Sequence, residues 1–351
     1  MSNWTFLRHS RSCHSRFKTQ RFQNNERLAS SFSTSGEGRA ANEIPVQAAP
    51  PPVRVELTES SGRGVFAIRK IGAGELLHTA KPLVSYPSLS TIQRVCYFCL
   101  RKLKNTANDQ SQSVAFCSEN CENQAKVVIF RHKMNLFQTL LYFQAFLGVE
   151  VKADWVAFND YCRSLGLKYP LLVKRFACMV ISGAASANLL DILQPAILSP
   201  RMTSEMEEGF GLLKSAFKVA NFPDEKMAFL TKQWYTGILA RIRINAFRIE
   251  CAGGLNEDLL QSAAASVETE AAVGNAVYML PSFYNHDCDP NAHILWIENV
   301  DAKLMALRDV EEGEELRICY IDTSMDRGAR QTFLSQGFGF HCTCLRCMSG
   351  D

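Results

Sequence analysis

Hydrophobic and polar positions follow two kinds of pattern along the chain. Residues 53–86 alternate apolar and polar positions around Gly and Pro, which predicts short strands. Residues 122–147, 170–193 and 223–242 repeat apolar residues at three- and four-residue steps, which predicts helices with core-facing stripes. From residue 245 onward short strands return, with turn signals at "CAGG" and "EEGEE". The pattern predicts an α+β protein in which a helical insert interrupts a strand-rich core.

The length and hydropathy of the chain indicate a globular protein. With 351 residues and 47% hydrophobic content, it can bury a core and form two or three units of ~150 residues. The only long apolar run, at 176–187, is shorter than the ~20 residues of a bilayer span and is soon followed by Asn188 and Asp191. We therefore expect no membrane span.

Charge is concentrated at the amino-terminal end. Residues 1–35 carry six basic side chains and one acid, a net +5, which leaves −2 on the rest of the chain. This Ser-rich, basic leader with scattered aromatic residues is typical of a transit peptide, so we expect a mitochondrial matrix location; a basic tail on a nuclear, cytoplasmic or plastid protein is the alternative. The slightly acidic body argues against a general nucleic-acid surface. Residues 36–52 are rich in Gly, Ala and Pro, which predicts a stiff linker.

Two groups stand out among the thirteen cysteines. The first forms two close pairs, Cys96 with Cys99 and Cys117 with Cys121. Without a secretory signal the thiols are expected to be reduced, and paired thiols at these gaps favour zinc over disulfides. Because structural zinc takes four tetrahedral ligands, these four cysteines predict a closed zinc site.

The second group lies at the carboxyl end and supplies only three close ligands: Cys342, Cys344 and Cys347. A structural zinc asks for a fourth, and Cys288, within the polar stretch "FYNHDCDPN" at 283–291, is our candidate. A zinc bound there would hold the carboxyl end of the chain against this stretch.

Four motifs now occur in a characteristic order. They are "GRGVFAIRKIGAGELL" (62–77), "NHDCDPN" (285–291), "EEGEELRICYI" (311–321) and "FHCTCLRC" (340–347). Together they resemble the SET-domain protein-lysine methyltransferases, and the cysteine pairs between 96 and 121 narrow the resemblance to the SET and MYND type, with a plant trithorax-related member as one option.

The resemblance implies a strand-rich SET core interrupted by a MYND-like zinc knuckle and a helical insert, closed by a post-SET zinc site. Only two of the usual four MYND ligand pairs are present, so the resemblance implies one zinc in the knuckle and, with the post-SET site, two zinc ions in all. The segments expected are a leader (1–35), a linker (36–52), N-terminal SET strands (53–90), the knuckle (91–125), the helical insert (126–242), the core SET segment (243–325) and the post-SET segment (326–351).

The resemblance also assigns the binding of the methyl donor S-adenosylmethionine. The residues implied are Gly62, Arg63 and Gly64 of the "GRG" loop, Asn245 of "RINAF", Asn285, His286 and Phe340. A GxG sequence alone could be any tight turn, and His286 alone could be a core histidine. Position 287 is Asp where Ser is common in the family, which bears on donor binding.

Catalysis is assigned to two tyrosines by the same resemblance. Tyr320 aligns with the catalytic tyrosine, and Tyr278 with an aromatic wall of the lysine channel, to which Phe338 and Phe340 add. On periodicity alone these residues would be ordinary core. A lysine ammonium has a pKa near ~10.4 and must lose a proton before it attacks, so an apolar channel that disfavours charge suits this reaction.

The implied function is lysine N-methylation by a monomer that acts on a protein substrate, either a histone tail or an organellar or cytosolic protein. One alternative is a non-catalytic SET and MYND peptide reader or scaffold. Another is a zinc-dependent nucleic-acid binder, which "RKLK" at 101–104 favours. The acidic body opposes that reading, so we expect no direct nucleic-acid contact.

Overall fold

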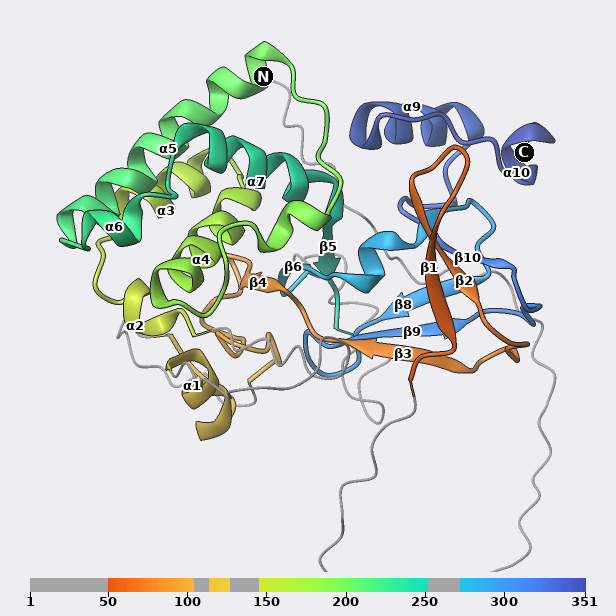
Figure 1. Cartoon of the computed structure of the whole chain (residues 1–351), viewed down its shortest axis with the longest axis horizontal. Helices are drawn as coiled ribbons and strands as arrows, with labels where there is room; N and C mark the ends of the chain where they lie inside the picture. Colours follow the sequence, from red (N-terminus) through yellow and green to blue (C-terminus); the bar gives the residue numbers. More distant parts are fainter. Residues whose placement is uncertain (1–49, 104–113, 127–144, 252–271) are drawn as a thin grey trace, which may run out of the picture.

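The computed structural model of the chain describes residues 50–103, 114–126, 145–251 and 272–351. Most helices gather on one side and most strands on the other (Figure 1). The leader and most of the linker lie outside the described residues, so the mitochondrial location stays a prediction. Within the described ranges, no helix is both long and apolar enough to cross a bilayer.

Three small sheets form the strand-rich half. Their strands are β1 (Val53–Leu57), β2 (Arg63–Ala67), β3 (Leu76–Ala80), β4 (Val84–Pro87), β5 (Ala246–Ile249), β6 (Gly274–Val277), β7 (Asn285–His286), β8 (Ala292–Leu295), β9 (Ala302–Ala306) and β10 (Glu315–Ile318). The sheet orders are β1-β2-β10-β7, β3-β9-β8 and β4-β6-β5. Within these sheets only β7 and β10 pair in parallel, while the other pairs are antiparallel. The short strands predicted over 53–86 are therefore confirmed.

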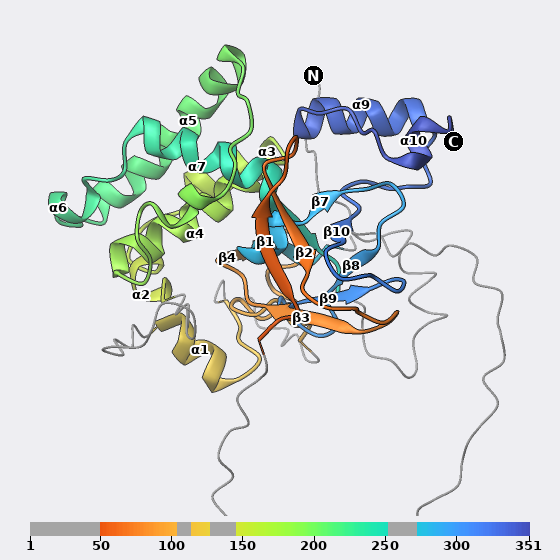
Figure 2. The same ribbon diagram turned by 45° about the vertical axis from the view of Figure 1, so that its right-hand side comes forward.

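The helical half lies between β4 and β5 in sequence (Figure 2). Its helices are α1 (Glu119–Lys126), α2 (Leu147–Glu150), α3 (Val156–Ser164), α4 (Tyr169–Ser182), α5 (Pro200–Val219), α6 (Asp224–Met227) and α7 (Lys232–Asn245), with a short 3-10 turn at Leu189–Ile192. Nearly every residue of α4 is buried, because its sequence is apolar around most of its circumference. Helix α4 is thus the centre of this half, and the predicted α+β class with helical content is confirmed. Most of the helix predicted over 122–147 lies outside the described residues.

A buried charge cluster joins the helical half to the cysteine-containing segment that follows β4. Glu150, which is 5% exposed, accepts a hydrogen bond from the Tyr97 hydroxyl at 2.7 Å and pairs with Lys174 at 3.0 Å and Arg175 at 3.3 Å. Arg175 also donates to the Tyr97 carbonyl at 3.3 Å, and Lys174 to the Tyr86 hydroxyl at 2.7 Å. Since unpaired buried charges are costly, this mutual pairing fixes α2, α4, β4 and the Tyr97 turn together.

Two further helices close the chain over the strands. Helix α9 (Arg327–Phe338) begins at Asp326, whose side chain accepts from Ala329 N at 2.9 Å, and ends at Gly339, which has φ = +81°. Glycine adopts this left-handed conformation without a Cβ penalty. Helix α10 (Leu345–Met348) follows, and α9 lies beside the turn between β1 and β2 (Figures 1 and 2). This arrangement carries the terminal cysteines back to the sheet that contains β7.

Candidate active site

The parallel pairing of β7 with β10 brings two distant motifs side by side. Asn285 lies opposite Arg317 and His286 opposite Ile318, and Asp287 N donates to the Ile318 carbonyl at 3.1 Å. The stretch "NHDC" therefore runs along the strand that leads directly into Tyr320.

Tyr320 is held at both ends and is only 7% exposed. Its hydroxyl donates to the Tyr284 carbonyl at 2.6 Å, and its backbone N–H donates to His286 Nδ1 at 3.1 Å. The rings of Phe338 and Phe340 lie 5.0 Å and 6.4 Å from the Tyr320 ring, centroid to centroid. Because the hydroxyl hydrogen is committed to a carbonyl, the oxygen lone pairs are the part of Tyr320 that can act on a ligand.

His286 is a link between Tyr320 and the cysteine group. Its Nδ1 accepts from the Tyr320 backbone, and its Nε2 lies 3.3 Å from Cys288 Sγ. Since an Nδ1 that accepts carries no hydrogen in the neutral ring, Nε2 bears it and donates to the sulfur. Both ring nitrogens of His286 are therefore used inside the protein. A contact between His286 and S-adenosylmethionine, which the resemblance implies, stays a prediction.

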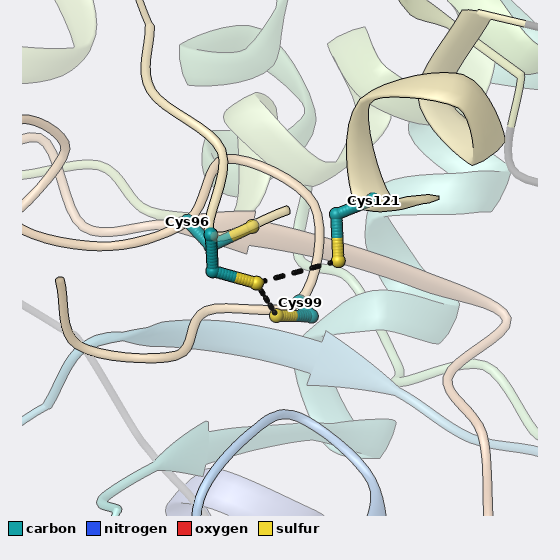
Figure 3. A group of neighbouring side chains, drawn as sticks. Cys96, Cys99 and Cys121 are labelled. Carbon is teal, nitrogen blue, oxygen red and sulfur yellow. Dashed lines mark hydrogen bonds between the residues drawn. The ribbon is translucent and has the colours of Figure 1, made fainter. Parts of the chain in front are cut away.

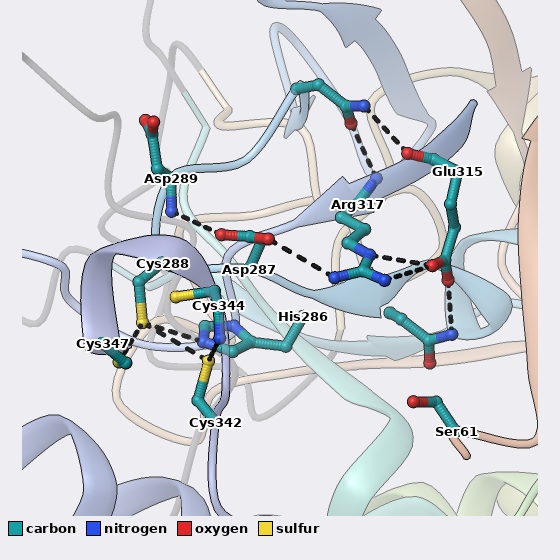
Figure 4. Close-up of polar contacts among 12 residues, drawn as sticks. Ser61, His286, Asp287, Cys288, Asp289, Glu315, Arg317, Cys342, Cys344 and Cys347 are labelled. Carbon is teal, nitrogen blue, oxygen red and sulfur yellow. Dashed lines mark hydrogen bonds and ion pairs between the residues drawn. The ribbon is translucent and has the colours of Figure 1, made fainter. Parts of the chain in front are cut away.

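The structure brings the carboxyl-terminal cysteines together with Cys288 (Figure 4). The four sulfur atoms, from Cys288, Cys342, Cys344 and Cys347, lie within 4.8 Å of one another, and all four residues are buried. A buried Arg330 donates to Cys347 Sγ at 3.8 Å. Four thiolates around one point suit tetrahedral zinc, and Arg330 offsets part of the negative charge that such a site carries. The donor set therefore fits zinc, with His286 and Arg330 as hydrogen-bonding neighbours of the ligands.

The other cysteine group fits zinc as well. The sulfur atoms of Cys96, Cys99, Cys117 and Cys121 lie within 4.8 Å of one another, and Figure 3 shows three of these side chains converging. Cys117 Sγ is 3.5 Å from both Cys99 Sγ and Cys121 Sγ. The Cys99 carbonyl accepts from Val300 N at 2.8 Å. The group is thus a closed structural site, tied to the strand-rich half by a backbone hydrogen bond.

Glycine shapes the "GRG" sequence where the turn after β1 leads into β2. Gly62 has φ = +73°, in the left-handed region. A Cβ on Gly64 would lie 2.7 Å from Glu315 Oε1 and 2.8 Å from Thr58 Cγ2, closer than real contacts allow. Arg63 is exposed, with its guanidinium carbon 4.9 Å from the centre of the Phe283 ring. The two glycines therefore let the loop lie directly against Glu315, next to Asn285.

The orientation of the Asn285 amide is fixed by two acceptors. Its Nδ2 donates to the Arg63 carbonyl at 3.1 Å and to Glu315 Oε1 at 2.7 Å. Glu315 in turn pairs with Arg317 at 2.6 Å, and Arg317 reaches Asp287 at 3.5 Å (Figure 4). Since Nδ2 is used by these acceptors, the amide carbonyl oxygen is turned the other way, where it can accept from a ligand's ammonium group.

A polar pocket adjoins this network. Its volume is about 270 Å³, and its lining consists of Asp287, Asp289, Asn291, Arg308, Glu314, Glu315 and Arg317. Carboxylates outnumber guanidinium groups in this lining. The aspartate at 287, where serine is common in the family, therefore serves as a partner of Arg317 and belongs to a wall that favours positive charge.

Two other residues that the resemblance implies, Asn245 and Tyr278, make mainly internal contacts in the structure. Asn245, at the end of α7, donates through Nδ2 to the carbonyls of Gln194 and Arg241, both at 2.8 Å. Gln194 Oε1 would be 3.6 Å from a Cβ on Gly62, so Asn245 fixes a segment that borders the "GRG" loop. A role for Asn245 in binding S-adenosylmethionine stays a prediction.

Tyr278 is fully buried at the end of β6. Its hydroxyl donates to the Val300 carbonyl at 2.5 Å and accepts from Trp296 Nε1 at 2.8 Å. Its ring lies 5.6 Å from Phe247, centroid to centroid. These are the contacts of a core residue, so a place for Tyr278 in the lysine channel also stays a prediction.

Several residues of the site were missed by the sequence reasoning. Tyr284 supplies the carbonyl that binds the Tyr320 hydroxyl, and Glu315 orients Asn285. Both residues lie in or beside motifs that the sequence analysis singled out, but no local pattern indicates these two contacts. His78, whose Nε2 makes a 3.0 Å hydrogen bond with the Tyr284 hydroxyl, had no sequence signal, because an isolated histidine in a predicted strand is unremarkable.

His78 makes the stability of the fold depend on pH. Burial lowers the pKa of His78 from 6.5 to about 4. Between these pH values the imidazole is therefore protonated in the unfolded chain but neutral in the folded one. Stability should therefore fall by about 3 kcal/mol as the pH drops from about 6.5 to about 4, and His78 should contribute no further change below that. Urea unfolding across this range checks it. The loss should be smaller in His78→Gln; an equal loss in that variant would contradict the assignment.

Comparison with known proteins agrees with this geometry. The SET domain family matches residues 62–321, well over half of the chain. The chain therefore belongs to the SET-domain family, and the match spans the "GRG" loop, Asn285 and Tyr320.

Individual relatives refine the likeness. The chain is 57% identical to Histone-lysine N-methyltransferase ATXR4 of Arabidopsis thaliana, with 100% of both chains covered. It is 26% identical to Histone-lysine N-methyltransferase SMYD3 of Homo sapiens, over 86% of this chain and 63% of that one. A solved structure of the SET domain of LSMT bound to lysine and AdoHcy covers 84% of this chain and 54% of that one, with a TM-score of 0.35 and 12% identity, too distant to transfer any detail of its site.

Proposed function

We propose that the chain is an S-adenosylmethionine-dependent protein-lysine N-methyltransferase. The observation that carries this proposal is the position of Tyr320: its hydroxyl is fixed on the Tyr284 carbonyl, among the Phe338 and Phe340 rings, one strand away from Asn285. Membership of the SET-domain family and the identity to ATXR4 support the same activity.

The residues present fit the methyl donor. The amino-acid end of S-adenosylmethionine carries an ammonium, from which the side-chain amide oxygen of Asn285 can accept a hydrogen bond beside the acidic Glu315. Its sulfonium is a cation, and the aromatic rings around Tyr320 favour cations at their faces. Gly62 and Gly64 allow the backbone of the "GRG" loop to adopt its turn beside these groups.

The protein's own residues account for the remaining requirements of methyl transfer. When bound, the donor supplies an activated methyl group to a neutral amine. A lysine ammonium is stabilised mainly by its hydrogen bonds to water, so burial beside Tyr320, which removes that water, lowers its pKa and promotes loss of its proton; the sulfonium has no such proton to lose. The Tyr320 oxygen, whose hydrogen is donated to the Tyr284 carbonyl, can accept a hydrogen bond from the amine and orient it. Catalysis is then mostly positioning, at ~3–3.5 Å between reacting atoms.

The substrate is a protein that presents a lysine. The relatives ATXR4 and SMYD3 are named as histone-lysine methyltransferases, so histone tails are the first substrates to test. The polar pocket that Asp287 helps to form is lined mainly by carboxylates, which suit the basic sequences of such tails.

Incubation of the purified chain with radiolabelled S-adenosylmethionine and either histones or a mitochondrial extract tests the function. We expect label on lysine side chains, and competition by excess unlabelled donor. Calorimetry should show donor binding by the chain alone. If the chain binds no donor, the enzyme proposal is wrong and a peptide reader is favoured. Binding of nucleic acid in place of donor would favour the zinc-dependent nucleic-acid alternative.

A further inference from the structure

Strand β3 contains an irregularity that places a polar side chain inside the protein. Its register against β9 shifts between Leu76 and His78, as a β-bulge does. Adjacent residues of a regular strand point to opposite faces, but here Leu77 and His78 are both buried, at 3% and 8% exposure. Bulges commonly redirect a side chain near a functional site. The bulge therefore turns His78 inward.

The partner of His78 is Tyr284, which is fully buried. His78 Nε2 and the Tyr284 hydroxyl form a 3.0 Å hydrogen bond, and the two rings lie 5.9 Å apart, centroid to centroid. A buried hydroxyl without this bond would pay the cost of desolvation. The hydrogen bond thus fixes where the ring of Tyr284 can lie.

The backbone carbonyl of Tyr284 holds the hydroxyl of Tyr320. The distance between the two oxygens is 2.6 Å, and Tyr284 directly precedes Asn285 in the chain. The ring and the carbonyl of one residue share a Cα, so a shift of the ring that a change of side-chain rotamer does not absorb moves the carbonyl. His78 can therefore influence the direction of the Tyr320 hydroxyl without touching it.

We infer that His78 and the Tyr284 side chain form a positioning pair that holds the Tyr284 carbonyl where it orients the Tyr320 hydroxyl. The inference rests on the proposed methyltransferase function. His78 and Tyr284 act through Tyr320 and need not contact the substrate. Because a displacement of ~1 Å near a reacting centre can cost up to about 100-fold in rate, the loss of one hydrogen bond in this pair should be visible in catalysis.

Four variants separate positioning from packing. Tyr284→Phe keeps the ring and the carbonyl but removes the hydroxyl. His78→Leu keeps bulk without the hydrogen bond, whereas His78→Gln can place an amide near the position of Nε2. Leu77→Ala is the matched control, because it creates a cavity at the neighbouring buried position of the same strand.

We expect kcat to fall roughly 10- to 100-fold in Tyr284→Phe and His78→Leu, with the KM for the donor unchanged. His78→Gln should recover most of the rate. The double variant His78→Leu with Tyr284→Phe should be no slower than the worse single variant, since both remove the same bond. Leu77→Ala should lower the melting temperature but retain kcat.

An activity-independent measurement distinguishes failure of this inference from failure of the proposed function. In NMR spectra of chain containing isotope-labelled tyrosine, the Tyr320 ring signal, assigned by its absence in Tyr320→Phe, should shift in His78→Leu and stay in place in Leu77→Ala. A wild-type chain that transfers no methyl group overturns the function, and the NMR result still decides the inference. Unchanged kcat and an unchanged Tyr320 signal in folded Tyr284→Phe would overturn the inference alone. So would a loss of kcat in Leu77→Ala as large as that in Tyr284→Phe.

Discussion

Replacing Tyr320 with Phe should lower kcat for methyl transfer by about 100- to 1000-fold, the size of effect seen when one oriented hydrogen-bonding group is removed from an active site. The phenyl ring still packs against Phe338 and Phe340, but the oxygen that orients the amine is gone. Donor affinity should stay within about threefold. Single-turnover kinetics and calorimetry measure the two quantities separately.

A suitable control for this variant is Tyr161→Phe. The Tyr161 hydroxyl donates to the Glu205 carbonyl on the helical half, at 3.2 Å, far in sequence from every motif of the site. The Tyr161→Phe variant should retain the wild-type rate of methyl transfer. Undiminished labelling by Tyr320→Phe would remove Tyr320 from the mechanism, and a loss of donor binding in that variant would make it a binding residue instead.

Replacing Cys288 with Ser should release one of two zinc ions and abolish activity. Serine is a poor zinc ligand, and three cysteines alone do not complete a structural tetrahedral site. Without the metal, the terminal segment loses its attachment to "NHDC", and the Phe340 ring is no longer held 6.0 Å from His286. Elemental analysis should find two zinc ions per wild-type chain and one in the variant.

Cys251→Ala serves as the control for this change. Cys251 is half-buried and belongs to neither four-cysteine group, so its replacement should leave both metals bound and the activity intact. Retention of two zinc ions by Cys288→Ser would show that Cys288 is not the fourth ligand, whatever its effect on the rate.

The parts of the fold that the sequence predicted are those with strong local signals. Alternation predicted the strands before β4, and cysteine spacing predicted both four-cysteine groups, with Cys288 placed correctly among the terminal thiols. Close cysteine pairs restrict the chain so tightly that little else is needed to infer their geometry. The assignments of Asn245 and Tyr278 came from resemblance alone, and the structure gives both residues internal contacts.

What the sequence could not predict depends on packing between distant residues. Helix α5 was missed although Ser199 accepts from Met202 N and Pro200 occupies its first turn, because Gly209 and Gly211 weaken its helical pattern. The structure explains Gly209: a Cβ there would lie 2.6 Å from the Tyr235 hydroxyl. Tertiary contact requires this glycine at a local cost in helix propensity.

The inward turn of His78 had the same kind of cause. A bulge depends on the pairing of β3 with β9, and these strands are far apart in sequence. Likewise, Glu315 can orient Asn285 only because β7 and β10 pair in parallel. Neither relationship leaves a local pattern, so both had to be found in three dimensions.

The charge cluster around Glu150 has a consequence for how the chain can be divided. Tyr97, between the first two zinc ligands, supplies a hydroxyl to Glu150 and a carbonyl to Arg175. Excision of the knuckle would remove both partners from ions that are almost completely buried. The zinc knuckle is therefore not an independent module that could be deleted or transplanted, because the buried charges of the helical half need the hydroxyl and the carbonyl of Tyr97.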